Sequence, residues 1–264
     1  KLAVVMSVYD GEAHLREAVE SILGQTFREF EFIIVDDAST DATAEMLAGY
    51  QRRDERIRLH RNAENLGLTK SLNLGLTMSD AKYIARMDAD DVSAPHRLER
   101  QTQLLDARPE VGLCGTRTRV LEAARERQRR APTDGARIAA ELLFANCITH
   151  ASVMLRRQVL VEHDLRYDES LRRSQDYDLW TRLSTVTDLA ILREPLLYYR
   201  KHRGSVSSLD AGAQRDARTA IAHRTAAVVQ ARLRQTIYDH VVALGPAHVA
   251  GTRTGEVIVS MVEG

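Results

Sequence analysis

The sequence predicts an α/β fold with a mostly parallel sheet flanked by helices. Apolar runs and helical patterns alternate four times within the first 91 residues, which is typical of a sheet covered by helices on both faces. The connections between them are only a few residues long, as in compact α/β units. The apolar runs are continuous and rich in β-branched residues, as in strands that are buried on both sides.

The first half of the chain divides readily into elements. After Gly11 the apolar residues recur every three or four positions, which predicts an amphipathic helix. Thr40 or Asp41 is expected to cap the second helix, because short polar side chains accept hydrogen bonds from the first helical N–H groups. The expected strands are Leu2–Val8, Phe30–Val35, Ile57–His60 and Lys82–Met87, and the intervening helices carry Leu15, Val19, Ile22 and Leu23, then Met46, Leu47 and Tyr50, then Leu68, Leu72 and Leu76.

The second half is less regular. A helix is expected from just after Pro95 to about Arg108. The basic run Arg125–Arg130 is interpreted as a solvated or mobile loop, because charge runs usually face solvent. The remaining predictions are strands at Val111–Gly115, Thr116–Leu121 and Ser152–Leu155, a helix through Ile138, Leu142 and Leu143, a helix at Asp176–Leu183, extended segments at Leu189–Leu192 and Pro195–Lys201, and an Ala- and Arg-rich helix at Ala211–Arg234.

Composition argues against several classes of protein. The 37 basic and 37 acidic residues give a formal net charge of zero, so no nucleic-acid partner is expected from overall charge. No apolar run approaches the ~18 residues of a membrane span, so we expect a cytoplasmic protein, at most peripherally associated with a membrane through its C-terminal tail. Cys114 and Cys147 are far apart in the sequence and fit a reducing compartment. No G-x-G-x-x-G motif or P-loop follows the first strand, so any phosphate-bearing ligand must be held by side chains and a metal.

An acidic stretch follows the fourth expected strand. Asp88, Asp90 and Asp91 fall within four residues, at the carboxyl edge of the sheet, where open α/β sheets bind ligands. Carboxylates this close repel one another unless a cation lies among them, and Mg²⁺ or Mn²⁺ suits oxygen ligands. A structural interpretation stays open, in which Asp91 or Ser93 caps the next helix. A calcium loop is excluded, because its glycine and distal glutamate are missing.

Five segments, taken in order, resemble the motifs of the inverting family 2 glycosyltransferases. They are Val5–Gly11, Val35–Asp41, Asn65–Leu68, Arg86–Asp91 and Gln175–Trp180, and the resemblance covers roughly residues 2–207. Each motif alone is weak, but five in the family's order are specific. The resemblance implies a GT-A fold with a Rossmann-like sheet: a glycosyltransferase domain over residues 1–207, made of a nucleotide-binding half (1–91) and an acceptor half (92–207), and then a helical tail (208–264).

The nucleotide site is expected where the first, second and fourth strands end. Tyr9 offers a flat face to a base, and Asp37 is able to accept a hydrogen bond from a base N–H. Both residues also have a structural interpretation, as a loop tyrosine and a turn carboxylate. By resemblance, Asp88 approaches the ribose, Asp90 holds the metal that bridges the diphosphate, and Asp91 either orients the loop or binds metal through water. The full set expected to bind the nucleotide is Ser7, Tyr9, Asp37, Asn65, Gly67 and Asp88.

Asp176 matches the family's catalytic base. The family most often has Glu-Asp at this point, whereas this chain has Gln175-Asp176. A helix-capping role for Asp176 stays open, and Asp178, about 200° around the helix, is the other candidate. A single base with direct displacement implies inversion at the anomeric carbon, without the carboxylate nucleophile of a retaining glycosidase.

Late basic residues complete the expected site. His202 resembles a position that closes over the diphosphate and is a candidate metal or phosphate ligand, with Arg200 or Arg203 pairing the phosphates. His150 resembles a family segment near the acceptor. A purely structural role stays open for both histidines.

The sequence thus predicts a glycosyltransferase that uses Mn²⁺ or Mg²⁺. It would move a sugar from a nucleoside-diphosphate donor, with uridine as the expected base, to a hydroxyl group of a saccharide or lipid-linked acceptor. Two alternatives stay open. One is a sugar-nucleotide-binding domain without activity. The other is a nucleotidyltransferase, which would need a Gly- and Arg-rich phosphate loop that Ser7–Gly11 does not supply.

Overall fold

The computed structural model describes residues 1–122, 125–129, 131–171, 173–201 and 219–222. The chain divides into two compact units, Lys1–Thr219 and Ala220–Gly264. The fold described below is that of the first unit. The helix predicted at Ala211–Arg234 falls almost wholly outside the described residues. His202 and Arg203 also lie outside them.

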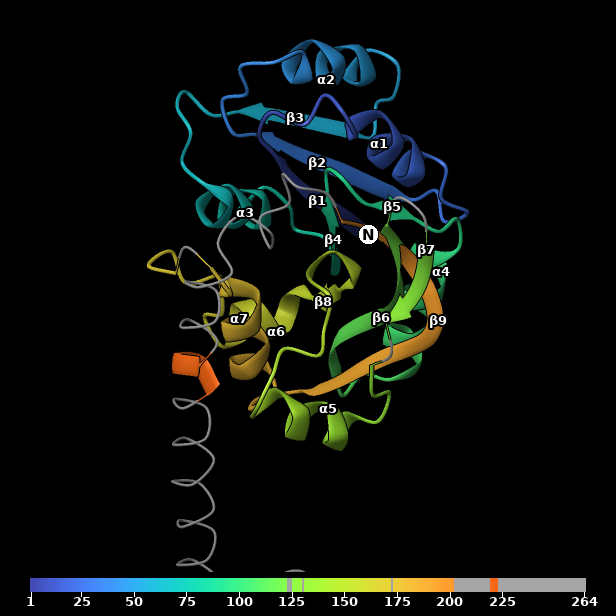
Figure 1. Cartoon of the computed structure of the whole chain (residues 1–264), viewed down its shortest axis with the longest axis vertical. Helices are drawn as coiled ribbons and strands as arrows, with labels where there is room; N and C mark the ends of the chain where they lie inside the picture. Colours follow the sequence, from blue (N-terminus) through green and yellow to red (C-terminus); the bar gives the residue numbers. More distant parts are fainter. Residues whose placement is uncertain (123–124, 130, 172, 202–218, 223–264) are drawn as a thin grey trace, which may run out of the picture. The chain divides into compact units, whose positions relative to one another are not determined.

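One sheet runs through the first unit (Figure 1). Its first half is parallel, in the order β3-β2-β1-β4. Its second half is mixed: β8 is antiparallel to both β4 and β6, β6 and β9 are parallel, and β5 and β7 pair antiparallel with β9 and β6. The strands are β1 (Leu2–Val8), β2 (Phe30–Asp36), β3 (Ile57–Arg61), β4 (Tyr83–Asp88), β5 (Val92–Ser93), β6 (Val111–Glu122), β7 (Arg125–Arg129), β8 (Met154–Arg156) and β9 (Asp188–Arg200).

Helices cover both faces of the central strand β1. Leu2, Val4 and Met6 belong to one apolar cluster together with Leu15, Ala18, Val19 and Ile22 of the first helix. On the opposite face, a Cβ added at Gly75 would lie 2.6 Å from Val5 Cγ1, so the third helix packs directly on the sheet. The continuous apolar run of β1 therefore predicted its burial correctly. The helices are α1 (Leu15–Leu23), α2 (Thr43–Gln51), α3 (Leu68–Thr77), α4 (Arg97–Ala107), α5 (Gly135–Leu142), α6 (Arg157–Glu162) and α7 (Gln175–Leu183), with a 3₁₀ helix at His150–Ser152.

Helix starts differ from those predicted. Ala42, not Thr40 or Asp41, occupies the N-cap position of α2, although Asp41 Oδ1 still accepts a hydrogen bond from Thr43 N–H at 3.0 Å. His96 occupies the N-cap position of α4, so the capping role considered for Asp91 or Ser93 is wrong. The geometry of the loop before a helix decides which residue occupies the N-cap position. The residue types alone do not determine this geometry.

Strand boundaries in the second half also differ. The two strands predicted at Val111–Gly115 and Thr116–Leu121 form one strand, β6, with register shifts next to Arg117. The two extended segments after Leu189 likewise form one strand, β9. Arg125–Arg129 is strand β7 rather than a loop, because backbone groups make the pairing whatever the charge of the side chains.

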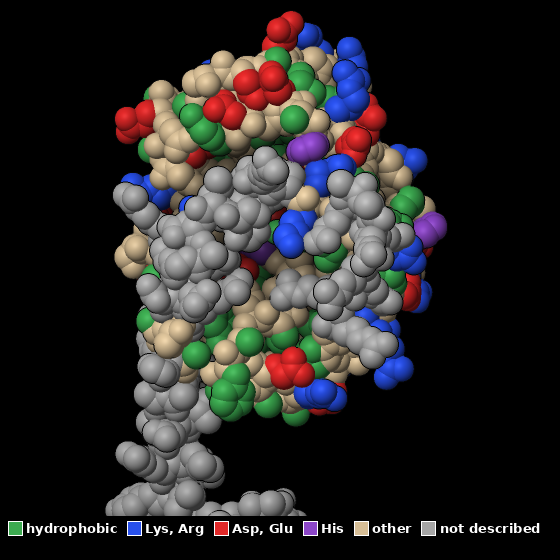
Figure 2. All heavy atoms as spheres, in the orientation of Figure 1, with side chains coloured by type: hydrophobic (Ala, Val, Ile, Leu, Met, Phe, Trp, Pro, Cys, Tyr) green, Lys and Arg blue, Asp and Glu red, His purple; other side chains and the backbone are tan. Residues whose placement is uncertain are grey.

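The surface agrees with a balanced composition. Figure 2 shows Lys and Arg side chains together with Asp and Glu side chains on the face that it draws. Within the part of the chain that the structure describes, no helix is both long and apolar enough to cross a bilayer.

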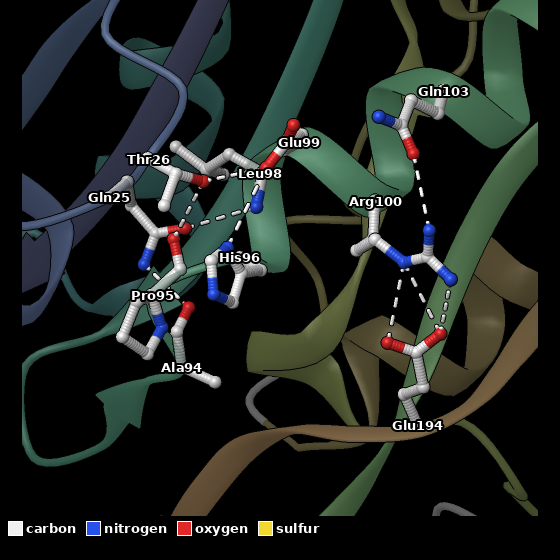
Figure 3. Close-up of polar contacts among 10 residues, drawn as sticks. All are labelled: Gln25, Thr26, Ala94, Pro95, His96, Leu98, Glu99, Arg100, Gln103 and Glu194. Atoms are coloured by element: carbon white, nitrogen blue, oxygen red, sulfur yellow. Dashed lines mark hydrogen bonds and ion pairs between the residues drawn. The ribbon is translucent and has the colours of Figure 1, made fainter.

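Gln25 anchors the segment that follows the acidic stretch (Figure 3). Its fully buried side chain donates to Ala94 O at 2.7 Å and accepts from Leu98 N at 3.0 Å. The exposed neighbour Thr26 donates to Glu99 Oε2 at 2.8 Å. Arg100 of α4 pairs with Glu194 of β9 at 2.7 Å. The segment after Asp91 is therefore held by the residues that follow α1, by α4 and, through α4, by β9.

Gln25→Ala is expected to lower the free energy of unfolding by about 2–3 kcal/mol. The substitution removes the four hydrogen bonds of the Gln25 side chain and leaves Leu98 N without that partner, whereas Ala94 O keeps its bond from Arg97 N. Urea denaturation of both proteins measures the loss. Thr26→Ala is the matched control, because it contacts the same segment from an exposed position and should cost at most about 0.5 kcal/mol. Equal losses for the two variants would contradict the anchoring role.

Candidate functional site

Three parallel strands bring the predicted residues to one edge of the sheet. In the strand register, Ser7 of β1 lies opposite Val35 of β2 and Asp88 of β4. Asp37 follows directly after β2, and its N–H donates to Val8 O at 2.8 Å. The predicted convergence of the ends of β1, β2 and β4 is therefore confirmed.

Asp37 is buried and organises the loop after β3. Its carboxylate accepts four hydrogen bonds from a segment of ten residues, and one donor, the N–H of Gly67, belongs to a residue with φ of 87°. Glycine adopts this backbone conformation without strain. The donors are Asn62 Nδ2 at 2.7 Å, Leu66 N at 2.9 Å, Gly67 N at 2.8 Å and Ser71 Oγ at 2.9 Å. Asp37 Oδ2 receives only the Gly67 bond among these, so it retains capacity for another donor.

Tyr9 and Asn65 are presented at the surface of this edge. The Tyr9 side chain is 49% exposed, and the negative charge of Asp10 raises the pKa of its phenol. Asp10 in turn accepts from Thr40 N at 2.7 Å, which fixes the β1 end against the β2 end. Asn65 is exposed in the loop that Asp37 holds. Both side chains are accessible to a ligand, and their nucleotide-binding roles stay predictions.

The three carboxylates of the acidic stretch lie together. Ligand oxygens of Asp88, Asp90 and Asp91 fall within 4.8 Å of one another. Asp91 is fully buried, and its Oδ1 accepts from Arg200 N at 2.9 Å, whereas its buried Oδ2 has no hydrogen-bond partner. Burial, with Asp88 and Asp90 adding to it, raises the pKa of Asp91 well above its usual range. This buried oxygen has no partner and lies beside two more carboxylates. A divalent cation would bind such a group of oxygen ligands, so the residues fit Mn²⁺ or Mg²⁺.

Two buried guanidinium groups accompany the acidic stretch, and sequence reasoning missed both. Arg86 of β4 forms an ion pair with Asp88. Arg97 is fully buried and donates to Arg86 O at 2.7 Å and to Gln101 Oε1 at 3.0 Å. Burial lowers the pKa of Arg97 to about 10, so it stays charged at neutral pH and offsets part of the acidic charge. An arginine is usually a surface residue. The only sign in the sequence that Arg97 is buried is its position next to Leu98, an apolar residue of the same helix.

Arg200 ties the end of β9 to the acidic stretch. Besides the main-chain bond to Asp91, its Nε donates to Asp90 O at 3.0 Å, and its Nη2 pairs with Glu17 of α1. The observed contacts are therefore those of a residue that holds the loop. Its predicted contact with phosphate stays a prediction, as do the roles of His202 and Arg203, which lie outside the described residues.

The two candidate bases both lie on α7, in different surroundings. Asp178 is fully buried and paired with Arg182 at 2.7 Å, so its negative charge is balanced by a side chain of the same helix. Asp176, in the first turn of α7, is half-buried, and its Oδ2 accepts from Asn146 Nδ2 at 2.8 Å. Asp176 is therefore the more accessible carboxylate of the two.

The aromatic side chains of His150, Tyr167 and Trp180 pack together. His150 Nε2 and Tyr167 Oη are 2.9 Å apart, and the His150 ring meets Tyr167 and Trp180 edge to face at 5.4 and 6.0 Å. Burial lowers the pKa of His150 and raises that of Tyr167, and the charges of both Asp88 and Asp176 act on each of them. The carboxylates predicted from distant parts of the chain thus act on the same aromatic group.

Comparisons with known proteins agree with this geometry. Residues 3–164 match the family described as Glycosyl transferase family 2. An uncharacterized glycosyltransferase of Haemophilus influenzae is 31% identical over 221 residues, covering 79% of this chain and 68% of that protein. The O-antigen biosynthesis glycosyltransferase WbnJ of Escherichia coli is 31% identical over 210 residues, covering 77% of this chain and 81% of that protein.

Solved structures share the fold. S. aureus TarS 1-349 in complex with UDP-GlcNAc superposes with a TM-score of 0.68 at 20% identity, over 79% of this chain and 61% of that one. The mannosyltransferase PcManGT from Pyrobaculum calidifontis, in complex with GDP-Man and Mn²⁺, has a TM-score of 0.64 at 16% identity, over 99% and 79% of the two chains. The chain spans about two thirds of the length of the first curated relatives that it matches, 68% and 70%.

Proposed function

This chain belongs to glycosyl transferase family 2 and has a GT-A-like fold, and we propose on that premise that it is a metal-dependent inverting glycosyltransferase. It moves a sugar from a nucleoside-diphosphate donor to a hydroxyl group of a saccharide or glycolipid. One observation carries the proposal. The ligand oxygens of Asp88, Asp90 and Asp91 lie within 4.8 Å of one another, and a buried oxygen of Asp91 has no hydrogen-bond partner.

The donor is bound at the edge formed by β1, β2 and β4. Tyr9 stacks on the base, and Asp37 Oδ2 accepts from a base N–H while its other hydrogen bonds hold the loop. Asp88 approaches the ribose, and Ser7, Asn65 and Gly67 line the same edge. UDP is the proposed nucleotide. The TarS structure, which shares the fold, contains UDP-GlcNAc and supports this choice, whereas the PcManGT structure contains GDP-Man, so guanosine donors belong in the test.

Asp90 and Asp91 hold the cation. When bound, Mn²⁺ or Mg²⁺ supplies positive charge that stabilises the departing diphosphate. Arg86 and Arg97 beneath the stretch limit the repulsion among the carboxylates, while Arg200 keeps Asp90 and Asp91 in place. The roles predicted for His202, as a metal or phosphate ligand, and for Arg203, as a phosphate ligand, stay part of the proposal, and both residues lie outside the described residues.

Asp176 acts as the general base. The acceptor hydroxyl transfers its proton to Asp176 while its oxygen attacks the anomeric carbon of the donor. The new C–O bond forms as the bond between that carbon and the diphosphate oxygen breaks, and the electron pair leaves with the nucleoside diphosphate. Attack from the side opposite the leaving group inverts the configuration, so an α-linked donor gives a β-linked product.

A donor and metal screen tests this function. Uridine, guanosine and thymidine diphosphate sugars are incubated with a saccharide acceptor panel and Mn²⁺, and nucleoside-diphosphate release and product are followed. We expect one donor class to be turned over, loss of transfer after chelation, recovery with Mn²⁺, and an inverted anomeric signal by NMR. Transfer that is indifferent to chelation would refute the metal role. Donor binding without transfer to any acceptor would favour a binding domain instead.

A further inference from the structure

We propose that Asn146 is a positioning residue for Asp176. It holds one oxygen of this carboxylate so that the other faces the acceptor. The inference rests on the proposed function, because it assumes that Asp176 is the base. Neither the motifs of the sequence nor the comparisons point to Asn146, which lies 30 residues before Asp176.

The orientation of the Asn146 amide follows from two of its hydrogen bonds. Its Oδ1 accepts from Ile148 N at 3.1 Å, and its Nδ2 donates to Asp176 Oδ2 at 2.8 Å. A backbone N–H is only a donor, so the carbonyl oxygen of the amide must face Ile148 and the NH₂ group must face Asp176. The side chain is thus fixed at both ends, and it offers Asp176 a donor that prefers the ionised carboxylate.

The segment that carries Asn146 is tied to the helix that carries Asp176. Tyr177, the residue after Asp176, donates from its buried hydroxyl to Leu142 O at 2.7 Å, at the end of α5. The start of α5 is capped by Asp134, which accepts from Arg137 N at 3.0 Å. With Asn146, α5 and its following segment therefore meet α7 at two points, on consecutive residues of α7.

The other charged groups near Asp176 cannot replace this donor. Asp178 on the same helix is paired with Arg182. His150 and Tyr167, on which Asp176 acts, form a hydrogen bond with each other. Arg86 and Asp88 of β4 also act on this aromatic pair, and they are ion-paired with each other. Asn146 is consequently the donor that the described structure directs at the base.

The physical consequence concerns the rotation of the base. Without the amide, the Asp176 carboxylate loses the hydrogen bond that orients it. It regains side-chain rotation, which lowers the fraction of molecules with Oδ1 directed at the acceptor. Donor binding should change little, because the amide contacts Asp176 rather than the edge formed by β1, β2 and β4.

Two variants and one control test the inference in the full chain. Asn146→Asp keeps the shape and the oxygen that accepts from Ile148 N, but it replaces the donor by a like charge. Asn146→Ala removes both bonds. Glu141→Gln on α5, which alters only a pair with Arg137 at 3.3 Å, is the matched control. The measurements are kcat and acceptor KM from pH 5 to 9 with Mn²⁺, together with donor affinity by calorimetry.

We expect kcat at neutral pH to fall on the order of 10²-fold in Asn146→Asp and about 10-fold in Asn146→Ala, as for a residue that orients a catalytic group. Acceptor KM should change less than kcat in both variants at every pH, because the proposed effect is on the orientation of the base. Donor affinity and the control variant should match the wild type.

The outcomes separate this inference from the proposed function. Unchanged kcat in both Asn146 variants, with Asp176→Asn inactive, would overturn the positioning role and leave the base intact. A loss of donor affinity that accompanies the fall in kcat would likewise overturn it, because a merely structural defect acts on binding as well. Transfer that survives in Asp176→Asn would instead refute the base itself. Asn146→Asp is close in shape to the native residue, so it keeps the test usable if Asn146→Ala fails to fold.

Discussion

Asp176→Asn is expected to lower kcat about 10³-fold, within the range that a general base contributes, while donor binding with Mn²⁺ is retained. The substitution keeps an oxygen that is able to accept from Asn146 Nδ2, so the helix start should persist. What is lost is a group that can take the acceptor's proton. Steady-state rates at fixed pH measure the fall, and calorimetry with the donor measures binding.

Asp178→Asn is the matched control for this prediction. Asp178 lies two residues away on the same helix but is buried and paired with Arg182. Its substitution should cost about 2–3 kcal/mol of folding free energy, because it weakens a largely buried ion pair, and it should leave the rate of the folded protein close to that of the wild type. A large rate loss in folded Asp178→Asn, or full activity in Asp176→Asn, would show that the two roles have been exchanged.

Asp91→Asn should remove the response to metal and, at the same time, stabilise the metal-free protein. Asparagine keeps the oxygen that accepts from Arg200 N and removes a buried charge that Asp88 and Asp90 repel. At neutral pH and without metal, the free energy of unfolding should rise by about 1 kcal/mol. The increase in melting temperature that Mn²⁺ produces in the wild type should vanish, because that increase reports binding to the native state. Transfer should fall on the order of 10²-fold.

Asp80→Asn provides the control for the loss of one negative charge. The Asp80 side chain is 97% exposed, although it contacts Arg157, so its stability and its response to Mn²⁺ should match the wild type. A variant Asp91→Asn that keeps the full thermal shift with Mn²⁺ would contradict the assignment of Asp91 to the cation. A strong loss of stability in that variant without metal would contradict the account of the repulsion.

The first half of the fold was predictable almost residue by residue. The bounds of β1 agree with the prediction, and the residues predicted for the first helix all lie in α1. The strands β2 and β3 differ from the prediction by one residue at one end, and β4 is shifted by one residue at both ends. Periodicity carries this information, because strands buried on both faces and amphipathic helices each leave a local pattern. The convergence of Ser7, Asp37 and Asp88 followed from topology, since parallel strands end at the same edge.

The supporting groups of the site were not predictable in the same way. Arg97 is a buried charge in a helix, Asn146 lies in an irregular connection, and the backbone of Arg200 meets an aspartate 109 positions away. None of these belongs to a periodic pattern, and each depends on contacts between segments that the sequence leaves far apart. The same holds for β7, whose strand state comes from pairing with β6.

By itself, the sequence determined the order of strands and helices in the first 91 residues, the acidic stretch at the end of β4 and the five motifs that resemble the family, because local spacing and residue type encode these features. Only the tertiary structure decided which carboxylate has an oxygen without a partner, which of Asp176 and Asp178 is more accessible, and which amide donates to Asp176. Burial and hydrogen-bond partners are properties of neighbours in space, and these neighbours are brought together only when the chain folds.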